Sequence, residues 1–342
     1  MVDVEHHPVV LITDYAWPSL DIEQEILGRV GATLLVAARG DEAELVNLAP
    51  QADAILTCWQ KVTPNVLDAA RTCRIVARYG IGLDNIAVDH ATSLGIPVTN
   101  VPDFCLDEVS DHAMALILSC ARRIVAFASE TRSGTWNPSA AQQLRRVRGK
   151  TLGIVGHGAI ARTLIPKARA FGLDILVFTP RIEPGEIEPG VNATNDLYAL
   201  LVAADFVSIH APATTETRNL IDATALKAMN PSAWLINTSR GALVDEAALI
   251  NALRSGQISG AALDVLAAEP PESSNPLLSM ENVIITPHVA FSSEEAVQDL
   301  QRDASQRVLE ALSGEVPGHL VNPSVLDSPQ YSRRLEGIWT VR

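Results

Sequence analysis

The chain has 342 residues, which is enough for about two domains of ordinary size. Hydrophobic residues make up 47% of the chain and charged residues 19%, a composition typical of a folded globular protein rather than a disordered one. With 26 basic and 40 acidic side chains the net charge is −14. A nucleic-acid or anionic-membrane partner is therefore not expected, because the field of so acidic a protein repels phosphates.

The sequence predicts a cytoplasmic protein. No apolar run reaches the roughly 20 residues that a membrane helix needs, and the opening "MVDVEHHPVVLITD" does not have the plan of a secretory signal. The four cysteines have neither metal-site nor redox spacing, so we expect free, buried thiols and no metal site: Cys58, Cys73, Cys105 and Cys120.

Short apolar runs alternate with amphipathic stretches along the first hundred residues. Strands buried on both faces give such runs, and their alternation with helices predicts a parallel sheet. Strands are expected at 9–14, 33–38, 54–58, 74–80 and 96–101, with helices near 20–29, 42–49, 64–72 and 87–94. One long helix is predicted over 106–134, where apolar positions recur at helical spacing before Gly134.

A second series of strands is expected at 151–156, 174–178, 206–210, 233–238, 258–265 and 282–287. A last helix at 292–314 precedes a tail that contains proline and glycine. The pattern predicts an α/β fold with two doubly wound parallel-sheet domains. We expect residues 1–104 plus 292–342 to form one domain, with the tail packed on it, and residues 105–291 to form the other.

The stretch "TLGIVGHGAIARTL" places Gly156 and Gly158 between a strand and a helix, with Ala161 at the third position of a G-x-G-x-x-G pattern. Such a turn lets the backbone approach a pyrophosphate, which binds at the helix N-terminus. The stretch therefore predicts a dinucleotide site; a purely structural turn is the alternative. Pro166 inside the following helix is expected to kink it. The turn residues assigned to the coenzyme are Gly156, His157, Gly158, Ala159 and Ile160.

Three further strands of this series end in side chains suited to acid–base chemistry: Arg240, Glu269 and His288. Active sites in such sheets gather at the carboxyl ends of strands. A histidine can exchange the proton that accompanies hydride transfer, a carboxylate can orient it, and an arginine can hold a substrate carboxylate. Each residue alone could instead be a surface ion pair or a packing histidine.

At this point the chain resembles the D-isomer-specific 2-hydroxyacid dehydrogenases. The matching pieces include "RYGIGLDNI", "GIPVTNVPDF", "GKTLGIVGHGAIA", "NTSRGALVDEAAL", "GAALDVLAAEPP" and "NPLLSMENVIITPH". The resemblance implies a flavodoxin-like substrate domain and a Rossmann-like dinucleotide-binding domain, with the active site in the cleft between them. It also implies Arg240 as carboxylate binder, His288 as acid/base and Glu269 as its partner.

The resemblance further implies that the loop Tyr79, Gly80, Ile81 and Gly82 binds the substrate carboxylate through backbone N–H groups. Asp264 would contact the nicotinamide carboxamide. Other coenzyme contacts are carried over to the residues that line the same strand ends: His210, Ala211, Pro212, Thr217, Thr238, Ser239 and Ala290. Members of the family usually form homodimers through the dinucleotide-binding domain, with the 106–134 helix near the interface.

Within the family, "VPDFCLDEVSDHA" and "TPHVAFSSEEAVQDLQ" look closest to a branch of dinucleotide-sensing corepressors, the C-terminal binding proteins, and to phosphoglycerate dehydrogenases. Arg78 matches an arginine of the corepressor branch and is expected either to reach the substrate or to form a structural ion pair. Phe291 stands where that branch carries tryptophan.

The strand end "LVFTPRIEP" bears on the choice of coenzyme. NAD-using relatives commonly carry an acid here, whereas this chain has Thr179 and Arg181. An arginine at this position can pair with a 2′-phosphate, so the sequence favours NADP(H). NAD(H) is the alternative, and the acidic side chains of Glu183, Glu186 and Glu188 weaken the case for a phosphate site.

The resemblance predicts an enzyme that reduces a 2-keto acid reversibly to a D-2-hydroxy acid. Side chains expected to face the substrate are Trp59, Gln60, Tyr79, Ile81 and Phe291, several of which are apolar, so an uncharged substrate side chain is favoured; each could also be an ordinary packing residue. A dinucleotide-sensing corepressor-like protein and a dehydrogenase of a small anion such as phosphite are the alternatives.

Overall fold

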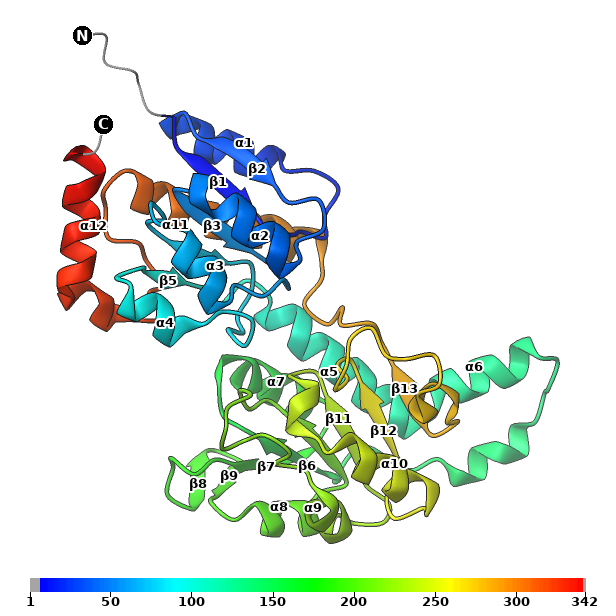
Figure 1. Ribbon diagram of the computed structural model, residues 1–342. Helices are drawn as coiled ribbons and strands as arrows, with labels where there is room; N and C mark the ends of the chain where they lie inside the picture. The colour runs from blue at the N-terminus through cyan, green and yellow to red at the C-terminus, as the bar shows by residue number, and fades with distance from the viewer. Residues whose placement is uncertain (1–6, 341–342) are drawn as a thin grey trace. The chain divides into compact units, whose positions relative to one another are not determined.

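The computed structural model describes residues 7–340 (Figure 1). The chain divides into two compact units, which are described separately. Unit 1 contains the residues up to Phe104 and from Ser293 onward, and unit 2 contains Cys105–Ser292. The predicted fold class, two α/β domains built on parallel sheets, is confirmed.

The sheet of unit 1 has five parallel strands in the order β2-β1-β3-β4-β5. This is the flavodoxin-like order, in which the strand order reverses between β1 and β3. The strands are shorter than the apolar runs that predicted them, because only the residues in the hydrogen-bonded ladder count. They are β1 Val9–Ile12, β2 Thr33–Val36, β3 Ala54–Thr57, β4 Val76–Arg78 and β5 Val98–Thr99.

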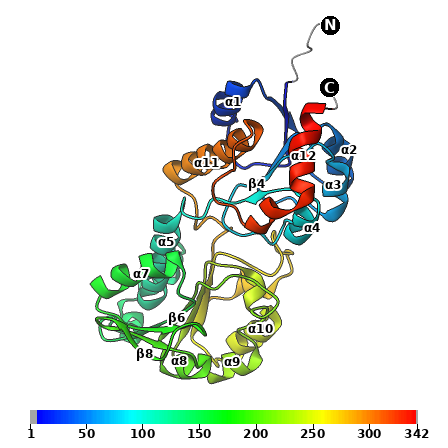
Figure 2. The same cartoon turned by 90° about the vertical axis from the view of Figure 1, so that its left-hand side faces the viewer.

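Helices cover both faces of this sheet, as a doubly wound fold requires (Figure 2). The helices α1, Asp21–Leu27, and α11, Glu294–Leu312, pack on one face with Val10 and Leu56 of the strands. The opposite face is covered by α2 Glu42–Leu48, α3 Pro64–Ala69 and α4 Val88–Ser93.

The segment after α11 packs on the rest of unit 1, as expected for the tail. The side chain of Asn322 accepts a hydrogen bond from the N–H of Val98 at 2.8 Å and donates to the carbonyl of Ile96 at 3.1 Å. No helix was predicted after residue 314, but the structure adds a short 3₁₀ turn and a helix, α12 Pro329–Thr340. From this helix Arg334 donates to the carbonyl of Leu94.

The sheet of unit 2 has eight strands in the order β13-β12-β11-β10-β6-β7-β9-β8. Apart from the edge strand β8, which pairs antiparallel with β9, all pairs are parallel. Read from β9 to β12, the order is that of a Rossmann fold, with its reversal between β6 and β10. The strands are β6 Thr151–Val155, β7 Asp174–Phe178, β8 Gly185–Glu188, β9 Val191–Thr194, β10 Phe206–Ile209, β11 Trp234–Asn237, β12 Gly260–Leu263 and β13 Val283–Ile285.

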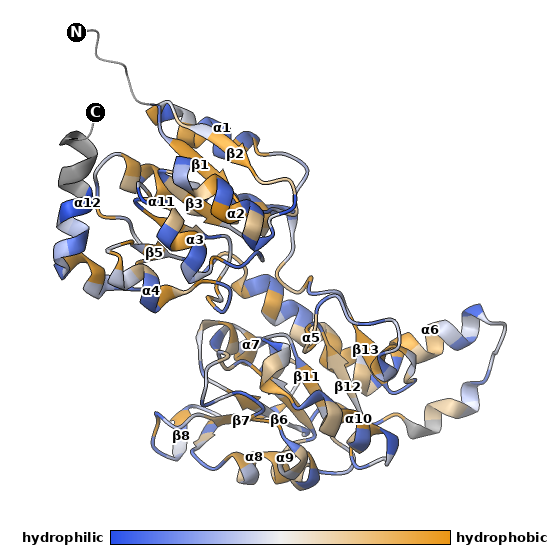
Figure 3. Ribbon diagram, viewed as in Figure 1, coloured by the Kyte–Doolittle hydropathy of each residue, from blue (hydrophilic) through white to orange (hydrophobic). Residues whose placement is uncertain are grey.

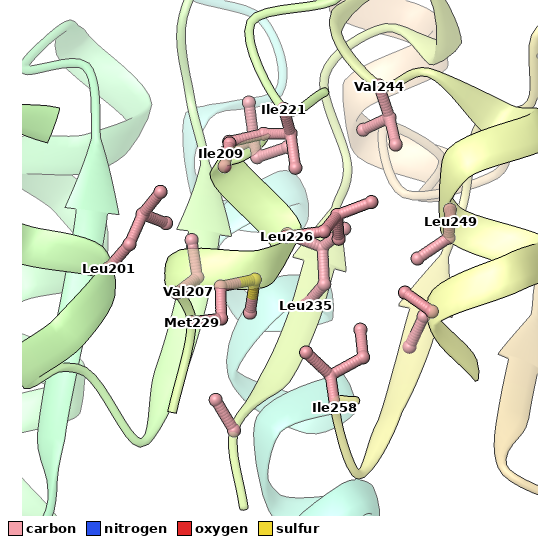
Figure 4. Close-up of a cluster of buried hydrophobic side chains, with 14 of the residues drawn as sticks. Leu201, Val207, Ile209, Ile221, Leu226, Met229, Leu235, Val244, Leu249 and Ile258 are labelled. Carbon is pink, nitrogen blue, oxygen red and sulfur yellow. The ribbon is translucent and has the colours of Figure 1, made fainter. Parts of the chain in front are cut away.

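Two hydrophobic cores hold this sheet between its helices. One lies under α5, Leu106–Arg122, and α7, Ala159–Ala170. The other, shown in Figure 4, joins residues such as Val207 and Leu235 of the strands to the helices α8 Leu197–Ala203, α9 Ala223–Ala228 and α10 Glu246–Arg254. Figure 3 shows apolar residues concentrated on the strands and alternating with polar residues along the helices.

The prediction of one helix over 106–134 is wrong. The chain breaks at Arg123, whose φ of +50° is left-handed, and continues as a separate helix, α6 Ile124–Arg132. Within residues 7–340 no single helix is long and apolar enough to cross a membrane; α5 and α6 pass that test only together, although they are bent by 63°. The strands β8 and β9 were also missed.

Pro166 lies within α7, which continues as one helix through it. The side chain is on the exposed face of α7. Water can therefore reach the carbonyl of Arg162, which the proline leaves without its helical partner. This explains why the helix tolerates a residue that was expected to disrupt it.

Candidate active site

The glycine-rich turn lies where the strand order of unit 2 reverses. Gly156 follows β6 and has a φ of +102°, and a Cβ atom added to it would lie 2.7 Å from the carbonyl oxygen of His210 after β10. Gly158 caps α7, and a Cβ atom there would meet nothing within 4 Å. The first N–H groups of α7 have no helical partner, so this open turn presents free donors to an anion. The turn thus has the local structure that a dinucleotide site needs.

Two buried polar atoms at neighbouring strand ends have no hydrogen-bond partner within the described residues. They are Nδ1 of His210, after β10, and Oγ1 of Thr238, after β11. The other ring nitrogen of His210 lies 2.8 Å from Oγ of Ser208. Burial lowers the pKa of His210 to about 4, so its imidazole is neutral near pH 7. Orphaned neutral polar atoms beside an open glycine turn fit a polar ligand such as a nicotinamide dinucleotide.

The loop after β10 holds three further residues of the predicted coenzyme set, Ala211, Pro212 and Thr217, in a defined shape. Oγ1 of Thr217 donates to the carbonyl of Pro212 at 2.6 Å, which closes the turn that follows Ala211. Oγ of Ser239 donates to the carbonyl of Ile209 at 2.7 Å and ties the end of β11 to the end of β10.

The tip of β7 carries Thr179, which is 7% exposed, and its hydroxyl lies 3.4 Å from the N–H of Arg181. The guanidinium of Arg181 is exposed and makes no ion pair or hydrogen bond within residues 7–340. Two acids of the β8–β9 hairpin behave differently from each other. Glu186 accepts the N–H of Gly190 at 2.8 Å, whereas the charge of Glu188 reaches His157 in the glycine turn. Burial and the charge of Arg162 nevertheless lower the pKa of His157.

The structure brings Glu269 and His288 together. The two follow β12 and β13, and His288 Nδ1 lies 2.6 Å from Glu269 Oε2. The other carboxylate oxygen accepts the N–H of Leu266 at 2.9 Å. Burial alone would raise the pKa of Glu269, but the hydrogen bond and charge of His288, the Leu266 N–H and the charge of Arg240 together lower it. The pair is therefore a carboxylate that holds the imidazole through Nδ1 and leaves Nε2 for another partner.

Arg240 reaches this pair because two loops touch. Gly241, at the start of a 3₁₀ turn Gly241–Leu243, packs so closely on the loop after β12 that a Cβ atom would overlap the carbonyl of Leu266. Arg240 donates from Nη1 to the carbonyl of Ser239 at 2.8 Å. Glycine at 241 is therefore needed to place the arginine beside the loop that carries Glu269.

His288 has an unusual backbone conformation, with a φ of +54°. Its N–H donates to the carbonyls of Asp264 at 2.8 Å and Thr286 at 3.0 Å. The ring of Phe291 stands edge-on to the imidazole, with 6.2 Å between centroids. The sequence had assigned Asp264 to the coenzyme; the structure shows that its carboxylate, 1% exposed, accepts hydrogen bonds from the N–H groups of Val289 and Ala290.

The residues that the sequence assigned to the substrate, apart from Arg240 and Phe291, lie in unit 1. Tyr79 is 2% exposed and donates its hydroxyl hydrogen to buried Glu23 at 3.0 Å, so its side chain points into the core. Arg78 is 7% exposed and donates to the carbonyls of Tyr79 and Gly82, at 2.5 and 3.1 Å. The guanidinium thus braces the 79–82 loop. Trp59 is 43% exposed.

Residues 114–290 match the family described as "D-isomer specific 2-hydroxyacid dehydrogenase, NAD binding domain". A glyoxylate reductase of Thermococcus litoralis is 39% identical over 292 residues, covering 83% of this chain and 88% of that protein. The chain belongs to the D-isomer-specific 2-hydroxyacid dehydrogenase family. It is an NAD(P)-dependent oxidoreductase of that family, as the resemblance implied.

Other proteins of the family are also similar to this chain, in sequence or in structure. A D-3-phosphoglycerate dehydrogenase of Methanocaldococcus jannaschii is 36% identical over 92% of this chain, which spans only 59% of that longer protein. Among solved structures, the NADPH-dependent glyoxylate/hydroxypyruvate reductase of Sinorhizobium meliloti, in complex with NADP and malonate, has a TM-score of 0.83. It is 30% identical, and the match covers 92% of this chain and 97% of that one.

Proposed function

We propose that this dehydrogenase reduces a small 2-keto acid to a D-2-hydroxy acid, with His288 as the proton donor. The 2.6 Å contact between His288 Nδ1 and Glu269 carries the proposal. When bound, the reduced nicotinamide supplies a hydride for the keto carbon. Because Glu269 occupies Nδ1, protonated His288 gives its Nε2 proton to the keto oxygen, and neutral His288 accepts that proton in the reverse direction.

Glu269 and Arg240 support this transfer in different ways. The carboxylate of Glu269 fixes the ring and stabilises its charged form, because it lies within hydrogen-bond distance of Nδ1. The guanidinium of Arg240 is the group suited to hold the substrate carboxylate by two hydrogen bonds and to polarise the adjacent carbonyl. For unit 1, the backbone N–H groups of the loop from Tyr79 to Gly82 are proposed as carboxylate donors.

Coenzyme oxidation tests this assignment with a panel of 2-keto acids. We expect turnover by the wild type, and a loss of about three orders of magnitude or more in kcat for His288→Ala, because general acid catalysis and orientation are lost together. Coenzyme affinity should change little, since the glycine turn is untouched. Full turnover by His288→Ala would overturn the role of this residue.

The preferred substrate is proposed to be small and uncharged beyond its carboxylate, such as glyoxylate or hydroxypyruvate. The relatives and neighbours bearing those names support this proposal, as does the apolar character of Trp59, Ile81 and Phe291. A phosphorylated substrate is the contrasting case, named for another relative. Comparing kcat/KM for hydroxypyruvate and its 3-phosphate distinguishes the two; a preference for the phosphate would contradict the proposal.

We propose that NADP(H) is preferred over NAD(H). The exposed guanidinium of Arg181 and the absence of an acid at Thr179 support this preference, and a solved neighbour binds NADP. Glu188 opposes it, because its charge reaches the glycine turn. Arg181→Ala should raise the Kd of NADPH about tenfold and leave that of NADH nearly unchanged, because a single charged hydrogen bond is lost. Arg254→Ala, another exposed arginine of unit 2, is the control. Equal effects on the Kd of both coenzymes would contradict the proposed contact between Arg181 and the 2′-phosphate.

We also propose a homodimer formed through unit 2. The helix α6 has no buried residue, and the chain around it exposes Ile124 by 52%, Val125 by 49% and Trp136 by 82%. A cavity of about 620 Å³ lies between α5, α6 and the β13 edge of the sheet. A second copy of the chain is the occupant proposed for this face, because such an apolar surface on an otherwise charged protein is typical of an interface.

The proposed dimer is tested by measuring the molar mass of the protein in solution, by light scattering after size-exclusion chromatography. Trp136→Glu with Val125→Asp should convert a dimer to a monomer, whereas Val202→Asp, on the equally exposed face of α8, should not. A wild-type monomer at micromolar concentration would contradict the proposal.

A cytoplasmic location is likewise proposed, supported by four cysteines that are all buried and unpaired. Fractionation of cells that express the chain would test it.

A further inference from the structure

The loop that carries His288 is held by a single buried carboxylate. Asp264 Oδ1 accepts the hydroxyl hydrogen of Thr286 at 2.6 Å and the N–H of Val289 at 3.0 Å, and Oδ2 accepts the N–H of Ala290 at 2.9 Å. The backbone of the same residue accepts the N–H of His288. Three residues around His288 are therefore attached to Asp264, and the attachment lies within unit 2.

A second histidine completes this set. Nε2 of His112, on α5, lies 3.0 Å from Thr286 Oγ1 and 3.7 Å from Asp264 Oδ1. The hydroxyl of Thr286 has one hydrogen, which goes to the carboxylate, so its oxygen must accept from the histidine. The network therefore assigns a hydrogen to Nε2 of His112. Its side chain is 23% exposed, compared with 1% for Asp264.

This support matters because the backbone of His288 is in an unfavourable region. A non-glycine residue with φ near +54° costs roughly 1–3 kcal/mol and persists only where its surroundings hold it. The contact of Nδ1 with Glu269 also depends on where the backbone places the ring. A displacement of about 1 Å at a reacting group can cost about 100-fold in rate.

We infer that His112 and Thr286 are positioning residues for the proton donor: through Asp264 they hold the backbone of the 286–290 loop so that His288 keeps its contact with Glu269. The inference rests on the proposed role of His288. His112 is 174 residues from Thr286 in sequence, and neither residue belongs to the set assigned to the substrate or the coenzyme. A loop that is merely packed would need no such chain of donors.

Conservative variants test this role. Thr286→Val keeps the shape but removes the hydroxyl, and we expect kcat to fall about 10- to 100-fold with the KM of the keto acid changed by less than about threefold. Thr286→Ser restores the hydroxyl and should recover most of the activity. His112→Leu should lower kcat by a smaller factor, about 3- to 10-fold, because Asp264 keeps its three donors. His90→Leu is the matched control, since His90 makes a similar contact with Asp68, at 2.8 Å, in unit 1.

A double-mutant cycle separates positioning from general stability. Glu269→Gln already loosens the ring of His288, so adding Thr286→Val should reduce kcat by less than the product of the two single effects. Unchanged kcat in both Thr286→Val and His112→Leu would overturn the inference, as would fully multiplicative effects or a loss that only follows the fall in melting temperature. An inactive wild type, or an active His288→Ala, would instead overturn the proposed function and the inference together.

Discussion

Each sheet reverses its strand order once, and the two reversal points are completed differently. In unit 1, between β1 and β3, the carboxylate of Asp14 accepts the N–H groups of Cys58, Trp59 and Gln60 at 3.0, 2.8 and 3.2 Å. In unit 2, between β6 and β10, no carboxylate within residues 7–340 accepts an N–H of the turn at Gly156, whose own N–H donates to the carbonyl of Phe178, and Nδ1 of buried His210 has no partner there either.

The difference shows that the backbone N–H groups beyond the strand ends of a parallel sheet can either be satisfied by the protein itself or remain available to a ligand. Parallel α/β sheets collect backbone donors beyond the carboxyl ends of their strands, which makes the reversal point a place for anionic ligands. In unit 1 the protein satisfies these donors with its own side chain. In unit 2 the donors at the start of α7 remain for a ligand, so we expect the coenzyme in unit 2.

The largest effect is expected for Gly156→Ala, which should remove the coenzyme site at the reversal point of unit 2. The new Cβ atom would lie 2.7 Å from the carbonyl of His210 at a φ that only glycine adopts easily. We expect coenzyme affinity to fall by about 100-fold or more, because the turn must move away from the strand end. Fluorescence titration measures this, and Gly28→Ala in unit 1, where a Cβ atom meets nothing within 4 Å, is the control. Unchanged affinity would show that the turn does not contact the coenzyme.

The neutral state of His210 predicts a pH dependence of stability. Its pKa is lowered from 6.5 to about 4, so between these values the unfolded chain binds a proton that the folded chain does not. Stability should therefore fall as the pH drops from 6.5 to 4, by up to about 3 kcal/mol. His210→Gln should flatten this part of the curve. Parallel urea curves for the two proteins at pH 7 and pH 5 would argue against a buried neutral imidazole.

Asp14→Ala tests the reversal point of unit 1, where the carboxylate of Asp14 satisfies the backbone donors. Three backbone N–H groups would lose their acceptor, which should cost about 1–3 kcal/mol in the free energy of unfolding. Urea denaturation measures the loss, and Glu315→Ala, an exposed acid of unit 1, should cost almost nothing. Coenzyme affinity should be unaffected. A large loss of coenzyme binding would remove the distinction between the two units.

The smallest effect is expected at Glu269. Its pKa is lowered in the folded protein, so its stabilising contribution is present above pH 4.5 and is lost as the pH falls through the folded pKa. Because the side chain is 36% exposed, solvent screening should keep this contribution below about 1 kcal/mol. Glu269→Gln should thus change the urea midpoint slightly at pH 7 and less at pH 3. A larger difference at pH 3 would contradict the direction of the shift.

Several features were accessible to sequence reasoning because they depend on local patterns. Apolar runs located the strands of both sheets, although each run extended beyond the ladder, as at 74–80, where the strand is only Val76–Arg78. In the missed hairpin β8–β9, the first strand, GEIE, is polar and begins with glycine, and the second, VNAT, is only four residues long, so its strand character becomes visible only once β9 pairs with β7. The break at Arg123 has neither proline nor glycine to signal it.

The amino-acid sequence by itself determined that there are two parallel sheets and which glycines, acids and histidine stand at the ends of the strands. Periodicity and short motifs encode these features, because burial on both faces and left-handed turns select residues locally. Only the tertiary structure decided which of those side chains meet. The contacts of His288 with Glu269, and of His112 with Thr286, depend on strand register and helix packing, which bring together residues 19 and 174 positions apart.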